Sequence, residues 1–128
     1  MVFEINEKID KWENLINFID TNVQSNNTNS IKVVIDIYGP FCGPCKKVEK
    51  FLEEIENDNS QNLCVLKMNI SRLNTKEFMK ELIQTHRVMS VPKVLLYKFD
   101  FDKKELLFLK NIVSFSNKKA LEKEIFNK

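Results

Sequence analysis

Two cysteines separated by two residues are the side chains of this sequence best suited to chemistry. They are Cys42 and Cys45, with Gly43 and Pro44 between them. The apolar segment 33–38 leads to them through a Gly–Pro turn, and an amphipathic helical pattern follows. Only a thiolate attacks a disulfide, and the unpaired N–H groups at a helix N-terminus favour negative charge on sulfur. Cys42 is therefore the predicted nucleophile of a thiol–disulfide exchange.

Cys45 has the spacing of a second reactive thiol. It follows Cys42 by one helical turn, at which slight tightening of the backbone allows a disulfide to close. The alternative is half of a zinc site, but such a site needs four ligands. The remaining cysteine and the single histidine, Cys64 and His86, form no second pair. We therefore expect no metal, and we expect Cys64 to be a small residue of the core, with a regulatory thiol as the alternative.

A carboxylate inside an apolar run is the candidate proton carrier. Asp36 interrupts the predicted strand six residues before Cys42. Burial of a lone carboxylate is costly and raises its pKa toward neutrality, where it can exchange protons with Cys45. Lys67, on the next predicted strand, is the candidate partner of this carboxylate. The alternative is that Asp36 faces solvent at the end of its strand.

A substrate of this dithiol needs a surface that holds it. Val91 and Pro92 precede a predicted strand, and a cis proline there would expose the Val91 backbone for strand-like pairing. We also predict an apolar surface around Phe41, Val91 and Ile112. The candidate substrate-binding residues are Phe41, Gly43, Pro44, Val91, Pro92 and Ile112.

The spacing of apolar residues predicts alternating strands and helices. Helices are expected over 7–20, after Cys45 for about four turns, over 75–85 with Phe78, Leu82 and Met79 inward, and from 116. Strands are expected over 3–5, 31–38, 63–70, 93–99 and 106–109, with a polar loop at 24–30. The order βαβαβαββα predicts a single α/β domain over residues 1–128.

Composition limits the function classes. The 128 residues carry a net charge of +2 with dispersed basic residues, which argues against nucleic acid or an anionic membrane as partner. No apolar run approaches the roughly 20 residues of a membrane span, and no signal peptide is visible. Three cysteines are too few for a secreted disulfide framework, so we expect a reducing, cytoplasmic location.

Three motifs resemble the thioredoxin family, in the right order along most of the chain. Residues 36–46 resemble its D-F-W-A-x-W-C-G-P-C-K signature, residues 67–70 its K-x-N-x-D element, and residues 87–92 its V-x-S-x-P motif. Two departures lie beside the predicted substrate surface. Phe41 replaces the usual Trp, and Lys93 replaces a usual Thr.

The resemblance implies a thioredoxin-like α/β fold, a central mixed β-sheet flanked by helices, and reduction of protein disulfides without a bound cofactor. It implies that Cys42 attacks, Cys45 resolves, Asp36 and Lys67 transfer the proton, and Pro92 is a cis proline facing the substrate. Electrons would come from a flavin-containing, NADPH-linked thioredoxin reductase or another dithiol donor, and we expect a monomer.

Two other functions remain open from the sequence. The altered residues Phe41 and Lys93 favour a thioredoxin-fold interaction module with weak or no turnover. An oxidase or isomerase is disfavoured by Gly43 and Pro44 between the cysteines and by the absence of a visible signal peptide.

Overall fold

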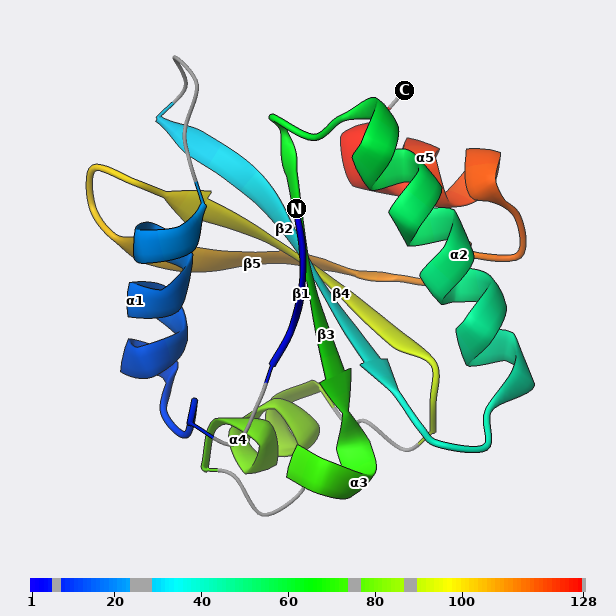
Figure 1. Ribbon diagram of the computed structural model, residues 1–128, viewed down its shortest axis with the longest axis horizontal. Coiled ribbons are helices and arrows are strands. Elements are labelled where there is room, and N and C mark those ends of the chain that lie inside the picture. Colours follow the sequence, from blue (N-terminus) through cyan, green and yellow to red (C-terminus); the bar gives the residue numbers. More distant parts are fainter. Residues whose placement is uncertain (6–7, 24–28, 74–76, 87–89, 128) are drawn as a thin grey trace.

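The strands of this chain form one mixed β-sheet. A computed structural model describes residues 1–5, 8–23, 29–73, 77–86 and 90–127. The strands lie in the order β1-β3-β2-β4-β5 (Figure 1). The three strands β1, β3 and β2 run parallel, and β4 and β5 complete the sheet as an antiparallel hairpin. Their bounds are β1 (Val2–Glu4), β2 (Ser30–Tyr38), β3 (Leu63–Asn69), β4 (Lys93–Asp100) and β5 (Glu105–Ile112).

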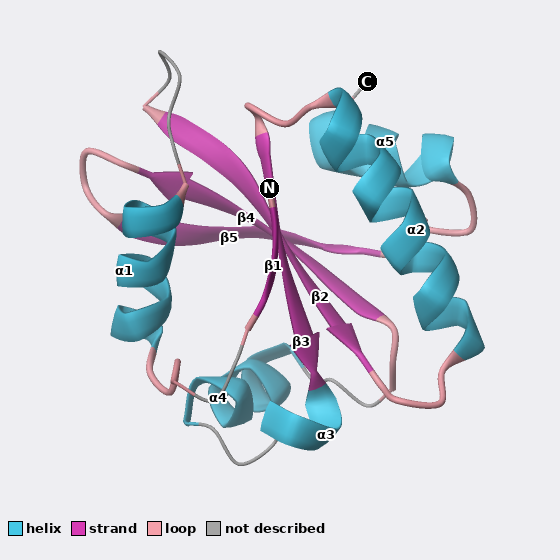
Figure 2. Ribbon diagram, in the orientation of Figure 1, coloured by secondary structure: helices cyan, strands magenta, loops and turns pink. Residues whose placement is uncertain are grey.

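Helices cover both faces of the sheet (Figure 2). Helices α1 (Trp12–Asn22) and α4 (Glu77–His86) pack on one face, and α2 (Gly43–Asp58) and α5 (Lys118–Phe126) pack on the other. A short helix, α3 (Ile70–Leu73), directly follows β3. The prediction of a central mixed sheet flanked by helices is therefore confirmed.

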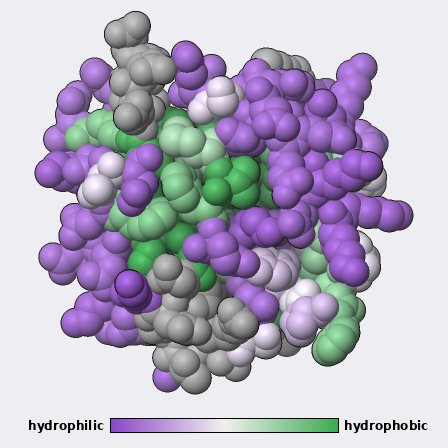
Figure 3. Space-filling model, in the orientation of Figure 1, coloured by the Kyte–Doolittle hydropathy of each residue, from purple (hydrophilic) through white to green (hydrophobic). Residues whose placement is uncertain are grey.

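The core is divided into two clusters because successive side chains of a strand point to opposite faces. On the α1/α4 face, β2 contributes Val33, Ile35 and Ile37, while Val34 contributes to the α2/α5 face. All four side chains are fully buried. In Figure 3, polar side chains cover the side of α2 and α5, and apolar side chains show along the middle of the view, where β1 forms an edge of the sheet.

Several element boundaries differ from the sequence prediction, and two of them are explained by local hydrogen bonds. Helix α1 begins at Trp12 because the Asn14 side chain accepts a hydrogen bond from the Lys11 backbone N–H at 3.1 Å, which fixes the helix start there. Ile9, predicted within this helix, is buried in the segment before it. Strand β3 ends one residue early, and the unpredicted α3 begins where Asn69 Oδ1 accepts from the Ser71 N–H at 3.0 Å.

Strand β5 is longer than the predicted 106–109. The ladder with β4 continues as far as the pair Val94 and Ile112, so eight residues are extended. The predicted burial of Leu82 is confirmed. Some predictions lie outside the described residues: most of the polar loop at 24–30, the first residues of the helices expected over 7–20 and 75–85, the side chains of Phe78 and Met79, and residues 87–89 of the third motif.

Candidate functional site

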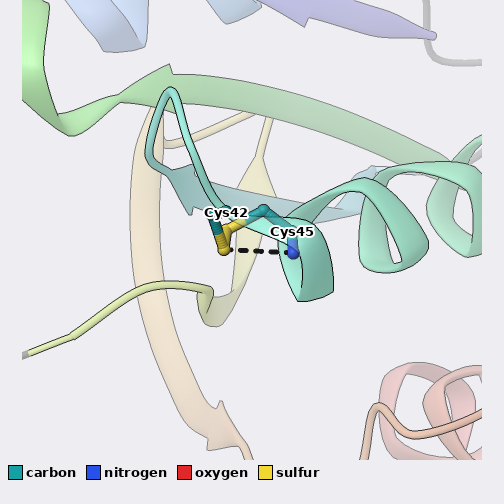
Figure 4. Close-up of a disulfide and its surroundings, with 2 residues drawn as sticks. All are labelled: Cys42 and Cys45. Carbon is teal, nitrogen blue, oxygen red and sulfur yellow. Dashed lines mark hydrogen bonds between the residues drawn. A yellow bond between two sulfur atoms is a disulfide. The ribbon is translucent and has the colours of Figure 1, made fainter.

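The dithiol lies where β2 passes into α2. Cys42 is the N-cap residue of α2, with an extended backbone, and Pro44 lies in the first helical turn. The backbone N–H of Cys45 donates a hydrogen bond to Cys42 Sγ at 3.2 Å (Figure 4). Proline suits this position because the first N–H groups of a helix have no intrahelical acceptor. The same unpaired groups make the helix start a favourable place for a thiolate.

The two sulfurs are joined but are not equivalent. Cys42 and Cys45 form a disulfide with their Cα atoms 5.2 Å apart, so the structure is the oxidised state. Cys45 is 3% exposed, whereas Cys42 is half-buried. Cys42 is therefore the sulfur that solvent reaches, and Cys45 is the buried one.

Asp36 is fully buried in the middle of the sheet. Neither of its carboxylate oxygens has a hydrogen-bond partner in the described part of the chain. Burial raises the pKa of this carboxyl to about 7; the Lys67 charge lowers it, and the charges of Glu49 and Glu4 raise it further. The predicted burial is confirmed, and the alternative of a solvent-facing Asp36 is wrong.

Lys67 lies beside Asp36 in the β2–β3 ladder, as the sequence predicts, but its ammonium group binds elsewhere. Its Nζ lies 2.6 Å from Glu49 Oε1 of α2 and 5.4 Å from the centroid of the Tyr38 ring. Burial lowers the pKa of Lys67, but the hydrogen bond and charge of Glu49, with the charges of Glu4 and Asp36, raise it overall. Lys67 is therefore a charged neighbour of Asp36 that forms its ion pair with Glu49.

Three polar residues close to Asp36 and Lys67 were not predicted from the sequence. Tyr38 lies two residues after Asp36 on the same strand, and its hydroxyl donates a hydrogen bond to Glu4. Burial and this bond raise the pKa of Tyr38 well above its usual value. The spacing of Glu49, one helical turn after Cys45, is a local signal that could have placed it toward the sheet. Glu4 has no local signal, because its neighbours come from pairing of β1 with β3.

The candidate substrate-binding residues differ in exposure. Phe41 is 100% exposed, and Gly43 and Pro44 are also exposed. The peptide bond between Val91 and Pro92 is cis, and both residues are half-buried.

A glycine brings the two loops of this surface together. A Cβ atom at Gly39 would lie 3.1 Å from Val91 Cγ2, so a larger residue would press on the Val91 side chain. The β2–α2 loop and the segment before β4 therefore approach closely at Gly39.

The predicted exposure of Ile112 is wrong. Its side chain is 3% exposed, because the residue pairs with Val94 in the β4–β5 ladder and points into the α2/α5 core. The next residue, Val113, lies beyond the end of β5 and is 77% exposed. Val113 thus replaces Ile112 as the exposed apolar side chain of this segment.

The third thiol belongs to the core. Cys64 is a free cysteine with no exposed surface, and burial raises its pKa to about 12. The prediction of a small buried residue is confirmed. Across the described residues, no three side chains of His, Cys, Asp or Glu gather as a metal site. Within the same ranges, no helix has the length and apolar character needed to cross a membrane.

A half-exposed cysteine at a helix N-terminus, a buried second cysteine and a buried carboxyl define a thiol–disulfide oxidoreductase of the α/β class. The sequence model of the family described as Thioredoxin matches residues 14–125. The chain therefore belongs to the thioredoxin family.

Relatives agree with this assignment. The thioredoxin of Mycobacterium bovis is 31% identical over 105 residues, which cover 82% of this chain and 78% of that protein. A bifunctional thioredoxin reductase/thioredoxin of Mycobacterium leprae is 30% identical over 66 residues, which cover 52% of this chain and 13% of that protein. Mitochondrial thioredoxin 3 of Saccharomyces cerevisiae in its oxidised form shares the fold, with a TM-score of 0.62 at 20% identity over 99% of this chain and 95% of that one.

Proposed function

We propose that this thiol–disulfide oxidoreductase reduces disulfides of proteins, with Cys42 as the attacking thiol. The observation that carries the proposal is the asymmetry of the pair: Cys42 is accessible at the start of α2, and Cys45 is buried one turn later. A thiolate at Cys42 gains from the helix N-terminus and from the N–H of Cys45.

The reaction proceeds in two exchanges. The Cys42 thiolate attacks one sulfur of the substrate disulfide, forms a mixed disulfide and releases the first substrate thiolate. Cys45 then loses its proton to the Asp36 carboxylate and attacks Cys42 Sγ, which expels the second substrate thiolate. The protein dithiol loses two electrons and the substrate disulfide gains them. The proton lost when Cys42 ionises and the Cys45 proton, which Asp36 then releases, protonate the two substrate thiolates. Lys67 acts on Asp36 as a neighbouring charge.

The substrate surface is built from the exposed residues around Cys42. We propose that an extended substrate segment pairs with the Val91 backbone beside Pro92 and packs on Phe41. Gly43 and Pro44 are exposed next to the disulfide, so they lie where a substrate would approach.

The protein must be re-reduced after each turnover. We propose an NADPH-linked, flavin-containing thioredoxin reductase or another dithiol donor as the electron source. The name of the Mycobacterium leprae relative joins a thioredoxin reductase and a thioredoxin in one protein, which supports such a partnership.

We also propose the domain organisation, the location and the oligomeric state of the protein. A single domain over residues 1–128 is supported by the one sheet and its two core clusters. A cytoplasmic location is supported by the small number of cysteines. A monomer that binds neither nucleic acid nor membrane is supported by the low, dispersed charge.

Insulin reduction driven by dithiothreitol tests the proposed function. The wild type should precipitate insulin well ahead of dithiothreitol alone, and Cys42→Ser should fall to the background rate. Cys64→Ala is the matched control, because Cys64 is buried away from solvent and should not affect turnover. Full activity in Cys42→Ser would refute the assignment of the nucleophile. A folded wild type with no rate above background would favour the interaction module.

A further inference from the structure

A row of charged side chains crosses three strands beneath α2. Glu4 of β1 pairs in register with Lys67 of β3, and Lys67 pairs in register with Asp36 of β2. Paired residues of neighbouring strands point to the same face, so all three side chains face α2. From α2, Glu49 reaches this row through its ion pair with Lys67.

Lys67 has two acidic neighbours within the sheet and one on the helix, and it binds the one on the helix. Its Nζ lies 2.6 Å from Glu49 Oε1. The Asp36 oxygens, on the adjacent ladder position, have no partner among the described residues. Without a competing acceptor, a lysine next to a buried carboxylate forms an ion pair with it and keeps it ionised.

Glu4 is the other acid of the row, and its carboxylate has a different hydrogen-bond partner. It accepts the hydroxyl of Tyr38, whose ring lies under the Lys67 ammonium. Asp36 thus faces Glu4 from β1, Tyr38 from its own strand, Lys67 from β3, and Glu49 from α2, one turn after Cys45. Of these residues, Glu49 is the one that forms an ion pair with Lys67, the in-register neighbour of Asp36.

We propose that Glu49 is a positioning residue of the dithiol reaction: it holds the Lys67 ammonium on α2 and so leaves the buried Asp36 carboxyl free to take and return the proton of Cys45. This inference rests on the proposed function, in which Asp36 is the proton acceptor. A carboxylate in an ion pair with Lys67 would be too weak a base to take a thiol proton near neutral pH. The pKa of about 7 for Asp36 agrees with a carboxyl that is not in an ion pair.

The titration of Asp36 tests this role without any substrate. The carbon-13 shift of its carboxyl is followed against pH in the oxidised full-length protein. Glu49→Ala removes both the charge and the acceptor, so Lys67 turns to Asp36 and the midpoint falls by about 1 pH unit or more. Lys67→Met raises the midpoint, because the Lys67 charge favours the ionised form. Glu53→Ala removes an exposed acid one turn later on α2 and is the matched control, with an unchanged midpoint.

The double variant separates positioning from simple charge repulsion. If Glu49 acts by holding Lys67, then Glu49→Ala should shift the midpoint in the Lys67→Met background by less than half as much as in the wild type. A full-sized shift in that background, or no shift in Glu49→Ala alone, would overturn the proposal.

Insulin reduction by the same variants is a separate readout. The acid limb of its pH profile should move to lower pH in Glu49→Ala, together with the Asp36 midpoint. If the wild type does not reduce insulin while the titrations behave as expected, the proposed function fails and the placement of Lys67 by Glu49 stands. If insulin is reduced and the midpoint does not move, only the role of Glu49 is refuted.

Discussion

The two faces of β2 differ chemically at the point where both are fully buried. Ile35 and Asp36 are neighbours on the strand, and both side chains have no exposed surface. Ile35 packs in the apolar cluster beneath α1 and α4. Asp36 faces α2 with no hydrogen-bond partner for its oxygens in the described residues. Burial stabilises the first side chain and is costly for the second, so stability does not explain Asp36.

The buried charged side chain of this face lies toward one end of it. Toward the other end, Val34, Leu63 and Val65 pack under α2 and α5, and Lys32 is only half-buried. Asp36 and Tyr38 occupy the end of β2 that leads into the loop before Cys42. The departure from an apolar core therefore coincides with the dithiol, as expected where a reaction needs a buried proton carrier.

The largest stability effect should come from the apolar face. Ile35→Ala removes a fully buried side chain and should lower the free energy of unfolding by about 2–5 kcal/mol. Urea denaturation measures this loss. The rate of insulin reduction per folded molecule should stay at the wild-type value. A large loss of this rate would show that the α1/α4 face also contributes to the reaction.

Asp36→Asn should raise the free energy of unfolding, whereas Ile35→Ala lowers it. Because the folded state raises the Asp36 pKa from 3.8 to about 7, folding holds this proton more tightly than the unfolded chain does. The free energy of unfolding of the wild type should therefore fall as the pH rises through this window and level off above it.

Asp36→Asn removes this pH-dependent loss of stability. It should also slow the attack of Cys45 on the mixed disulfide. At pH 8 it should be more stable than the wild type by on the order of 4 kcal/mol, and the difference should nearly vanish at pH 4. Urea denaturation across this range measures both curves. Parallel curves for the two proteins would show that Asp36 does not titrate in this way.

Phe41→Ala should leave stability nearly unchanged. The side chain is fully exposed, so the free energy of unfolding should shift by less than about 0.5 kcal/mol. The KM for insulin should rise several-fold with little change in kcat, because the ring is proposed to contact substrate. A clear loss of stability, or an unchanged KM, would remove Phe41 from the substrate surface.

Local patterns were sufficient to predict the centre of the fold and the dithiol. The apolar run of β2, the Gly–Pro turn and the helical periodicity of α2 all act over a few residues, so they place Cys42 and Cys45 at a helix start from sequence alone. The burial of Asp36 follows from its position inside that run.

Features that depend on distant packing or on very short elements could not be predicted. Helix α3 has four residues, too few for a periodic pattern. The burial of Ile112 depends on where the β4–β5 ladder ends. The choice of Glu49 over Asp36 by Lys67 depends on how α2 lies across β3, which no spacing within the sequence specifies.

The order of reactivity of the three thiols tests whether Cys42 is the attacking thiol. The reduced full-length protein is treated with limiting iodoacetamide between pH 6 and 8, and tandem mass spectrometry locates the label. We predict that Cys42 is alkylated first and already near neutral pH, while Cys45 and Cys64 stay protected in the folded protein. Alkylation of Cys45 or Cys64 before Cys42 would contradict this prediction.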